Sequence, residues 1–317
     1  MQPKINHAIE QVSVHTSARL HMGFYDLMHV NRFGSIGLSI DSPATSIDIK
    51  KSEKPLIVAN GCEKVVKITE LFVKALNLQS HFTLSAHQLM PAHVGFGSGT
   101  QMALAIGAGL NQLFNLNLSV PQIAAIANRG ARSGIGIAAF MHGGLIVDNG
   151  KKAEEIPEIA NRQLVPSHWR ILLITDSAHV GVYDEAELSA FKTLKPAQTS
   201  VKNMVLNYMI PAIERNDLLS FGAYMMDLQA YNGEFFAPIQ GGHYASQNVA
   251  EVLAWMQQNG APCVGQSSWG PTGFAIVGSA KLAESLKAKA QIAFANKPNI
   301  GFSMTRGNNS GAKIIFK

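Results

Sequence analysis

The sequence predicts an α+β protein of two domains. The chain has 317 residues, which is long enough for two modest hydrophobic cores. Short strand-like segments dominate its beginning, and four long helical patterns follow in its second half. We expect the boundary near 160–168, with one domain over 1–165 and a second domain over 166–317.

The first half alternates short strands with amphipathic helices. Apolar residues recur with strand periodicity at 11–16, 37–40, 45–49, 81–84 and 144–147. Helices are expected at 62–76, where the apolar positions follow a helical stripe, and at 100–114, which is rich in Ala and Leu. A further helix should begin after Ser119, which is a suitable N-cap residue.

The second half begins after a polar connector at 151–162. The run at 170–175 is typical of a buried strand. Helical patterns follow at 201–215, 217–230, 246–258 and 280–294. We expect strands at 273–277 and 312–316 to close the second domain.

Composition excludes several classes of protein. Cys62 and Cys263 lie far apart without CxxC spacing, which argues against a disulfide framework or a structural zinc site. No segment has the roughly 18–20 consecutive apolar residues of a membrane span, and the first residues lack a signal-peptide core, so we expect a cytoplasmic protein. The net charge of +5 is dispersed, which favours small anionic substrates over nucleic acid.

The segment 91–101 is the strongest functional motif. Gly95, Gly97 and Gly99 alternate just before a predicted helix, so backbone N–H groups can surround an anion at its N-terminus. Ser98 and Thr100 can donate hydroxyl groups to a phosphate, and Ser98 could also help to hold a metal ion. Glycine spacing alone is equally compatible with a helix-capping loop.

The same segment resembles the central motif of the GHMP-kinase structural superfamily. Pro91 is followed by Gly95-x-Gly97-Ser98, and 265–273 lies where the superfamily has a C-terminal glycine loop. The resemblance covers most of the chain. It implies a first domain with a left-handed β-α-β crossover and a ferredoxin-like second domain.

Two positions differ from the kinase pattern within this superfamily. Many of its kinases have a catalytic Asp two residues after a Ser-Gly pair, and Gly136 occupies that position after Ser133-Gly134. Glycine cannot accept a proton. Trp269 in the C-terminal loop would narrow the space for a nucleotide phosphate tail.

Four blocks are similar to the β-ribofuranosylaminobenzene 5′-phosphate synthase family: 18–27, 32–40, 97–101 and 129–136. The resemblance implies an early step of tetrahydromethanopterin biosynthesis. There, phosphoribosyl pyrophosphate condenses with 4-aminobenzoate or 4-hydroxybenzoate and releases pyrophosphate and CO2. It also implies Mg²⁺ as cofactor and a homodimer.

The resemblance and the residue types together suggest roles at the site. Asp26 would orient the aromatic amino group or a ribose hydroxyl, and Arg32 would bind the carboxylate. Arg129 and Arg132 would bind phosphate or carboxylate oxygens. The expected catalytic residues are Arg19, His21 and Asp26, and the expected substrate-binding residues are Arg32, Ser35, Gly95, Gly97, Ser98, Gly99, Thr100, Gln101, Arg129, Arg132 and Ser133.

Each of these residues also has an ordinary structural interpretation. Asp26 could cap a turn, the arginines could lie at helix ends on the surface, and a lone histidine is often only hydrogen-bonded in place. Asp148 and Asp176 are alternative carboxylates, and His93 is a second candidate histidine. Phe24, Tyr25 and Phe96 could face a benzoate ring or belong to the core.

Three functions therefore compete. The decarboxylating synthase is favoured, an ATP-dependent small-molecule kinase is the main alternative, and a non-catalytic sensor of a phosphorylated metabolite is the third.

Overall fold

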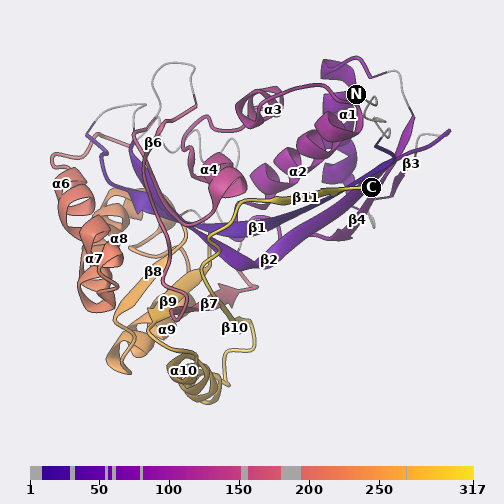
Figure 1. Ribbon diagram of the computed structural model, residues 1–317. Coiled ribbons are helices and arrows are strands. Elements are labelled where there is room, and N and C mark those ends of the chain that lie inside the picture. The colour runs from indigo at the N-terminus through magenta and orange to yellow at the C-terminus, as the bar shows by residue number, and fades with distance from the viewer. Residues whose placement is uncertain are drawn as a thin grey trace.

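The computed structural model contains two β-sheets with helices packed on them (Figure 1). It describes residues 9–28, 33–53, 56–58, 62–78, 81–150, 156–179, 194–268 and 270–317. The first part of the chain forms β1 (Gln11–Phe24), β2 (Ser35–Lys51), β3 (Leu56–Val58), α1 (Glu63–Ala75), β4 (Phe82–Gln88), α2 (Ser98–Leu113), α3 (Val120–Ile126), α4 (Ile135–His142), β5 (Leu145–Asp148) and β6 (Ile159–Gln163).

The second part forms a further sheet and the remaining helices. Its elements are β7 (Arg170–Asp176), α6 (Lys202–Met204), the π-helical segment η1 (Val205–Met209), α7 (Ile210–Glu214), α8 (Leu218–Gln240), α9 (Gln247–Gln258), β8 (Cys263–Gln266), β9 (Gly273–Val277), α10 (Ala280–Ala293), β10 (Ile300–Thr305) and β11 (Lys313–Phe316). None of the helices in the described ranges is long and apolar enough to cross a membrane.

The first sheet is organised by a long antiparallel pair of strands, β1 and β2. Its order is β11-β1-β2-β4-β3, and β5 and β6 extend it from β2. The segments 37–40 and 45–49, predicted as separate strands, belong to the single strand β2. β3 and β4 are parallel and are joined through α1, as a β-α-β crossover requires. The hand of this crossover stays a prediction.

Helices α1 to α4 lie over one face of this sheet (Figure 1). α2 is buried on nearly all sides, which its run of Ala, Leu and Gly permits. Gly107 lies where a Cβ would come within 2.6 Å of the Phe72 ring of α1. The close approach of α1 and α2 fixes the direction in which the N-terminus of α2 points, and the glycine motif precedes that end.

The second sheet has the order β10-β7-β9-β8. With the intervening helices this is the β-α-β-β-α-β arrangement of a ferredoxin-like domain, as predicted. α9 and α10 contribute Val252, Leu253 and Leu286 to the core on one face. On the other face, Leu173 and Phe274 share one cluster with residues of α8 and of β1. The two sheets are therefore joined by a common core.

The prediction that the strand at 312–316 closes the second domain is wrong. β11 pairs antiparallel with β1, with Val12 opposite Phe316 and His15 opposite Lys313. A short apolar segment can add to any sheet edge, and its sequence does not say which one. The chain thus returns from β10 to the first sheet, and β10, which the sequence reading missed, completes the second.

Two further elements differ from the sequence expectation. The segment predicted as a polar connector contains the edge strand β6, whose residues are mostly exposed. The helix expected at 201–215 is interrupted by η1, where the backbone bonds widen to π-helical spacing.

Candidate active site

A pocket of about 230 Å³ opens at the N-terminus of α2. β1, the loop before α2, the turn between α3 and α4, and the loop after β8 all contribute to its wall. Its lining residues are Arg19, His21, Phe24, Lys64, His93, Gly95, Phe96, Gly97, Ser98, Gly99, Thr100, Asn128, Arg129, Gly130, Ala131, Arg132, Ser133, Gly136 and Ser268.

The glycine loop forms the floor of this pocket. Gly95 and Gly97 adopt positive φ angles of 97° and 73°, and Gly97 is the N-cap of α2. The amides of Thr100 and Gln101 both bond to the carbonyl of Gly97. Those of Ser98 and Gly99 bond to nothing among the described residues and lie at the positive end of the helix. The loop therefore presents backbone donors to an anion.

Arg19 is built into the loop from the neighbouring strand β1. Its Nη1 donates to the carbonyl of Gly95 at 2.8 Å, and its backbone amide donates to the carbonyl of Phe96. A Cβ at Gly97 would lie 2.8 Å from Cζ of Arg19. Glycine at 97 therefore allows both the left-handed turn and the close approach of the guanidinium group.

His21 lies two residues further along β1 and is also buried. Its Nδ1 is 2.9 Å from Oγ of Ser268, and its ring centroid is 4.6 Å from that of Phe24. Burial, together with the charges of Arg19 and Arg132, lowers the pKa of His21 to about 3. The imidazole is therefore neutral at physiological pH.

Three more cations line the pocket. Arg129 and Arg132 come from the turn between α3 and α4, and Lys64 comes from the first turn of α1. A Cβ at Gly99 would lie 3.4 Å from Nζ of Lys64 and 3.7 Å from Nη2 of Arg129. Lys64 and Arg129 therefore meet at the N-terminus of α2. Among the described lining residues there are four cations with Arg19, and no carboxylate.

Asp148 holds the turn that carries the two arginines. This buried carboxylate accepts hydrogen bonds from the hydroxyl groups of Ser35 and Ser133 and from the amides of Gly134 and Gly150. Burial raises the pKa of Asp148, and these donors oppose the rise. Asp148 therefore shapes the pocket without lining it.

The structure brings most of the predicted site residues together. In the pocket are Arg19, His21, Gly95, Gly97, Ser98, Gly99, Thr100, Arg129, Arg132 and Ser133. Ser35 lies behind Ser133 and bonds to Asp148. Gln101 is fully buried, accepts from Thr16 and donates to the carbonyl of Gly136.

Several predicted positions lie elsewhere. Asp26 is outside the pocket lining, and one of its carboxylate oxygens is buried without a hydrogen bond to the described residues. Asp176 lies in the second domain, where it accepts from Ser246 and Asn248. Arg32 and Trp269, with the roles predicted for them, lie outside the described residues.

The aromatic candidates divide between wall and core. Phe24 and Phe96 line the pocket. Tyr25 is fully buried, and its hydroxyl donates to the carbonyl of Asp148 at 2.6 Å, so it is a core residue.

Sequence reasoning missed Lys64 and Asn128. Lys64 did carry a signal, because a cation in the first turn of a helix faces the positive end of the helix dipole. A bound anion close to Lys64 would offset this repulsion between two positive charges. Asn128 adopts a positive φ of 52° at the end of α3, and no pattern in the sequence marked it as a pocket residue.

The pocket offers little to a metal ion by itself. No cluster of three or more His, Cys, Asp or Glu side chains suited to a metal occurs in the described part of the chain. Ser98 and Thr100 supply hydroxyl oxygens, which suit Mg²⁺, but carboxylates usually hold it more strongly. The donor set therefore fits a magnesium ion only when bound phosphates supply most of its ligands.

Comparison with known proteins decides the family. Models of the GHMP kinases N terminal domain and of the GHMP kinases C terminal domain match residues 63–144 and 209–296. β-Ribofuranosylphenol 5′-phosphate synthase of Methanocaldococcus jannaschii is 31% identical over 95% of this chain and 99% of its own length. The enzyme of the same name from Archaeoglobus fulgidus is 30% identical over 83% and 87%. The chain belongs to the β-ribofuranosylphenol 5′-phosphate synthase family. It is thus a member of an enzyme family with the GHMP-kinase fold, as the sequence predicted.

Solved structures agree with this fold. A homoserine kinase from Cytophaga hutchinsonii superimposes with a TM-score of 0.66 over 99% of both chains, at 17% identity. A mevalonate diphosphate decarboxylase from Staphylococcus aureus gives a TM-score of 0.66 over 97% of this chain and 98% of its own, at 15% identity. At such identities the likeness concerns the fold alone.

Gly136 of this chain lies at the position where a carboxylate was expected for a kinase. In this chain a Cβ at that position would lie 3.0 Å from Cγ2 of Thr100, so Thr100 would have to move to admit a side chain. Gly136 is therefore packed against Thr100 at the start of α2.

Proposed function

We propose that this chain joins the ribosyl group of phosphoribosyl pyrophosphate to 4-hydroxybenzoate or 4-aminobenzoate, with loss of pyrophosphate and CO2. The observation that carries the proposal is the pocket itself, with four cations and backbone donors around one cavity and no carboxylate among its described lining residues. The name of the relatives specifies a phenol product, which 4-hydroxybenzoate would give after decarboxylation.

The charges of the pocket match those of the substrates. The reactants carry a 5′-phosphate, a pyrophosphate and a carboxylate, and the wall offers Arg19, Lys64, Arg129 and Arg132. Guanidinium groups bind phosphate and carboxylate oxygens in pairs, and the N-terminus of α2 adds backbone donors. We assign Lys64, Arg129 and the loop 97–100 to phosphate groups, because they converge at Gly99.

The reaction does not require a carboxylate base or a covalent nucleophile. The C1–oxygen bond of the ribose breaks as pyrophosphate leaves, and the ring carbon that bears the carboxylate forms a bond to C1. That carbon carries no proton. The bond from the ring to the carboxylate then breaks, its electrons restore the aromatic ring, and CO2 departs.

The chain contributes position and charge to these steps. Arg19 and the loop amides would stabilise the charge that develops on the departing pyrophosphate. Phe24 and Phe96 would pack on the aromatic acid and exclude water from the ribosyl cation. Magnesium, as a complex with pyrophosphate, would supply further positive charge, with Ser98 and Thr100 as its protein ligands.

The test is release of labelled CO2. Purified protein is incubated with Mg²⁺, phosphoribosyl pyrophosphate and carboxyl-labelled 4-hydroxybenzoate, with 4-aminobenzoate in a parallel sample. Release that needs both substrates is the expected result, and the faster acid identifies the preferred one. If neither acid releases CO2 and ATP stabilises the fold, the proposal is refuted in favour of a kinase.

Two accompanying properties are part of the same proposal. A homodimer is expected from the resemblance to this family, and sedimentation of the purified protein tests it. Phosphorylated substrates do not cross the hydrocarbon core of a membrane readily, which favours a reaction in the cytoplasm.

A further inference from the structure

The wall of the pocket contains a buried histidine nitrogen for which the described residues supply no hydrogen-bond partner. Nε2 of His21 has no hydrogen bond to the described residues, although the side chain lines the pocket and His21 as a whole is only 6% exposed. A buried polar atom without a partner costs free energy. Such an atom in a binding pocket indicates a place where a ligand supplies the missing group.

The two contacts of Ser268 on the other side of the ring favour one protonation state for Nδ1 and Nε2. The hydroxyl of Ser268 donates to the backbone carbonyl of His21 at 3.3 Å and lies 2.9 Å from Nδ1. A hydroxyl has one proton, so when it donates to the carbonyl it must accept the hydrogen bond from Nδ1–H. In a neutral imidazole the other nitrogen then carries a lone pair, so Nε2 is an acceptor.

The ring is also held firmly in this orientation. The backbone amide of His21 donates to Oγ of Ser267, and the amide of Ser268 donates to the carbonyl of His21. Phe24 packs on the ring. The loop after β8, from the second domain, thus fixes a side chain of β1, from the first.

With the proton on Nδ1, a phosphate does not suit Nε2 as its partner. A phosphate or carboxylate oxygen would place a lone pair against a lone pair. The four cations and the free loop amides are donors and serve those anions. The group that suits this tautomer is an uncharged O–H or N–H donor of a substrate.

We propose that Nε2 of His21 accepts a hydrogen bond from a hydroxyl or amino group of the substrates and thereby selects for it. This rests on the proposed function. Two substrate groups have this chemistry, namely the para substituent of the aromatic acid and a ribosyl hydroxyl. In the first case the bond would strengthen as the para group donates electrons to the ring during attack on the ribose.

Two variants at this position separate the roles of the two nitrogens. His21→Gln places an amide at about the depth of Nε2, and His21→Asn places one only at the depth of Nδ1. Binding is measured by calorimetry with pyrophosphate and Mg²⁺ present, for two pairs of probes. The pairs are 4-hydroxybenzoate against benzoate, and ribose 5-phosphate against 2-deoxyribose 5-phosphate.

We expect the native protein to prefer the hydroxylated member of one pair by on the order of tenfold, which corresponds to one hydrogen bond. His21→Asn should reduce that preference to about one, and His21→Gln should retain most of it. The pair whose preference disappears identifies the donor. Equal preferences in all three proteins would overturn the inference.

A variant that leaves the imidazole in place keeps the inference testable if the His21 variants fail to fold. Ser268→Ala keeps the imidazole and removes the acceptor of Nδ1–H, so it should weaken the same preference and leave pyrophosphate affinity unchanged. An unchanged preference in Ser268→Ala contradicts the inference. If the native protein releases CO2 but shows neither preference, only this inference fails. If it binds neither acid nor sugar phosphate, the proposed function fails with it.

Discussion

His21 is a neutral, buried base with Arg19 and Arg132 as its charged neighbours. The unfolded chain takes up a proton near the ordinary pKa of 6.5, and the folded chain does so only near 3. Stability from this residue is therefore complete above pH 6.5 and is lost progressively as the pH falls toward 3.

The pH dependence of unfolding tests this description of His21. Between pH 7 and pH 5 the native protein should lose about 2 kcal/mol of stability through His21, and His21→Gln should not lose this share. Urea unfolding at the two pH values measures the difference. The same change at the exposed His142 is the control, and an equal effect at both positions would contradict the assignment.

Single residues were predictable from the sequence where a local pattern carried them. Gly95, Gly97 and Gly99 predict a turn before a helix because their spacing and the apolar segment after them are local, although the spacing alone does not distinguish a phosphate-binding loop from a helix-capping loop. The partners of His21 could not be predicted, since Ser267 and Ser268 lie 246 and 247 residues away in the chain. Only the packing of the two domains brings them together.

The loop before α2 acts as one element with the strand beside it. The left-handed turn at Gly97 directs the helix N-terminus toward the pocket, and Arg19 of β1 fills the space that a side chain at 97 would take. Loop and strand therefore depend on each other for their shape.

Substitution of Gly97 tests this dependence. Gly97→Ala would place a Cβ 2.8 Å from Cζ of Arg19 and force a non-glycine residue into a left-handed conformation. We expect a loss of stability of about 1–2 kcal/mol, and at least tenfold weaker pyrophosphate binding. Thermal unfolding and calorimetry provide the two readouts.

Gly260→Ala is the matched control for this change. Gly260 also has a positive φ, of 97°, but a Cβ there would meet nothing within 4 Å. The Gly260→Ala variant should lose stability and bind pyrophosphate as tightly as the native protein. If both variants bind pyrophosphate normally, the contact between Arg19 and the loop does not support the site.

Among the elements, those with a strong period of their own were predicted best. α1, α9 and α10 follow their apolar stripes closely, and Ser246 and Ser279 cap the last two of them, whereas α2 was predicted from its run of Ala and Leu. β3, β6 and β10 were missed or misassigned. They are short strands at sheet edges, which form by pairing with a neighbouring strand and carry little pattern in their own sequence.

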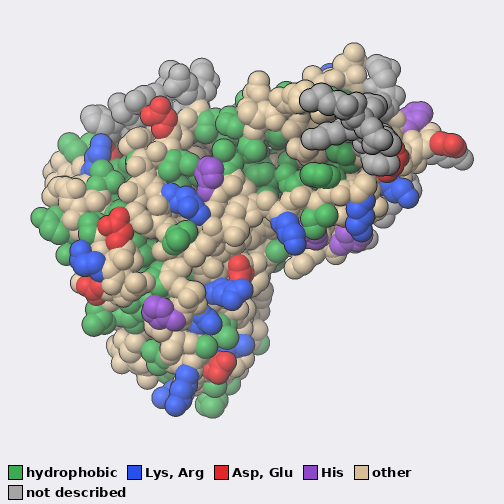
Figure 2. Space-filling view, in the orientation of Figure 1, with side chains coloured by type: hydrophobic (Ala, Val, Ile, Leu, Met, Phe, Trp, Pro, Cys, Tyr) green, Lys and Arg blue, Asp and Glu red, His purple; other side chains and the backbone are tan. Residues whose placement is uncertain are grey.

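At the scale of the whole molecule, positive and negative side chains are mixed on the surface in view. Figure 2 shows basic and acidic side chains interspersed over the face in view. The concentration of positive charge occurs inside the pocket, where four cations come from three separate elements or turns. The net charge of +5 suggested anionic substrates, but only the fold places these side chains together.

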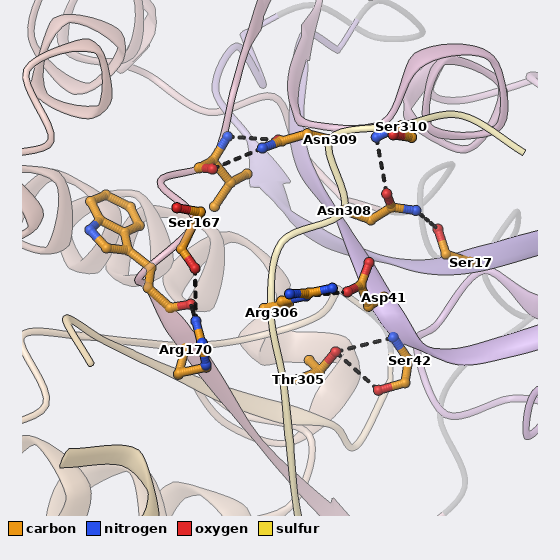
Figure 3. A network of polar contacts seen from close by, with 12 residues as sticks. Ser17, Asp41, Ser42, Ser167, Arg170, Thr305, Arg306, Asn308, Asn309 and Ser310 are labelled. Carbon is orange, nitrogen blue, oxygen red and sulfur yellow. Dashed lines mark hydrogen bonds and ion pairs between the residues drawn. The ribbon is translucent and has the colours of Figure 1, made fainter. Parts of the chain in front are cut away.

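The segment after β10 joins the two domains. In Figure 3 it crosses from the second sheet to the first, and the side-chain amides of the adjacent residues Asn308 and Asn309 hold it. Asn309 exchanges two hydrogen bonds with the backbone of Val165, at 2.8 and 2.9 Å, and Asn308 donates to Ser17 of β1. β11 then continues beside β1.

β11 follows the second domain in the sequence but pairs with the first domain, and this pairing leads to a prediction. Deletion of residues 311–317 removes the last segment of the chain, yet it should loosen the first domain, because β11 bonds to residues 12–15 of β1. Hydrogen exchange of the truncated protein should show faster exchange in 11–15 and unchanged exchange in β7 and β10. Phe316→Ala, which shortens a largely exposed side chain and keeps the backbone pairing, should leave both regions protected. Faster exchange in β7 would instead place the C-terminal strand in the second domain's cooperative unit, as the sequence alone had suggested.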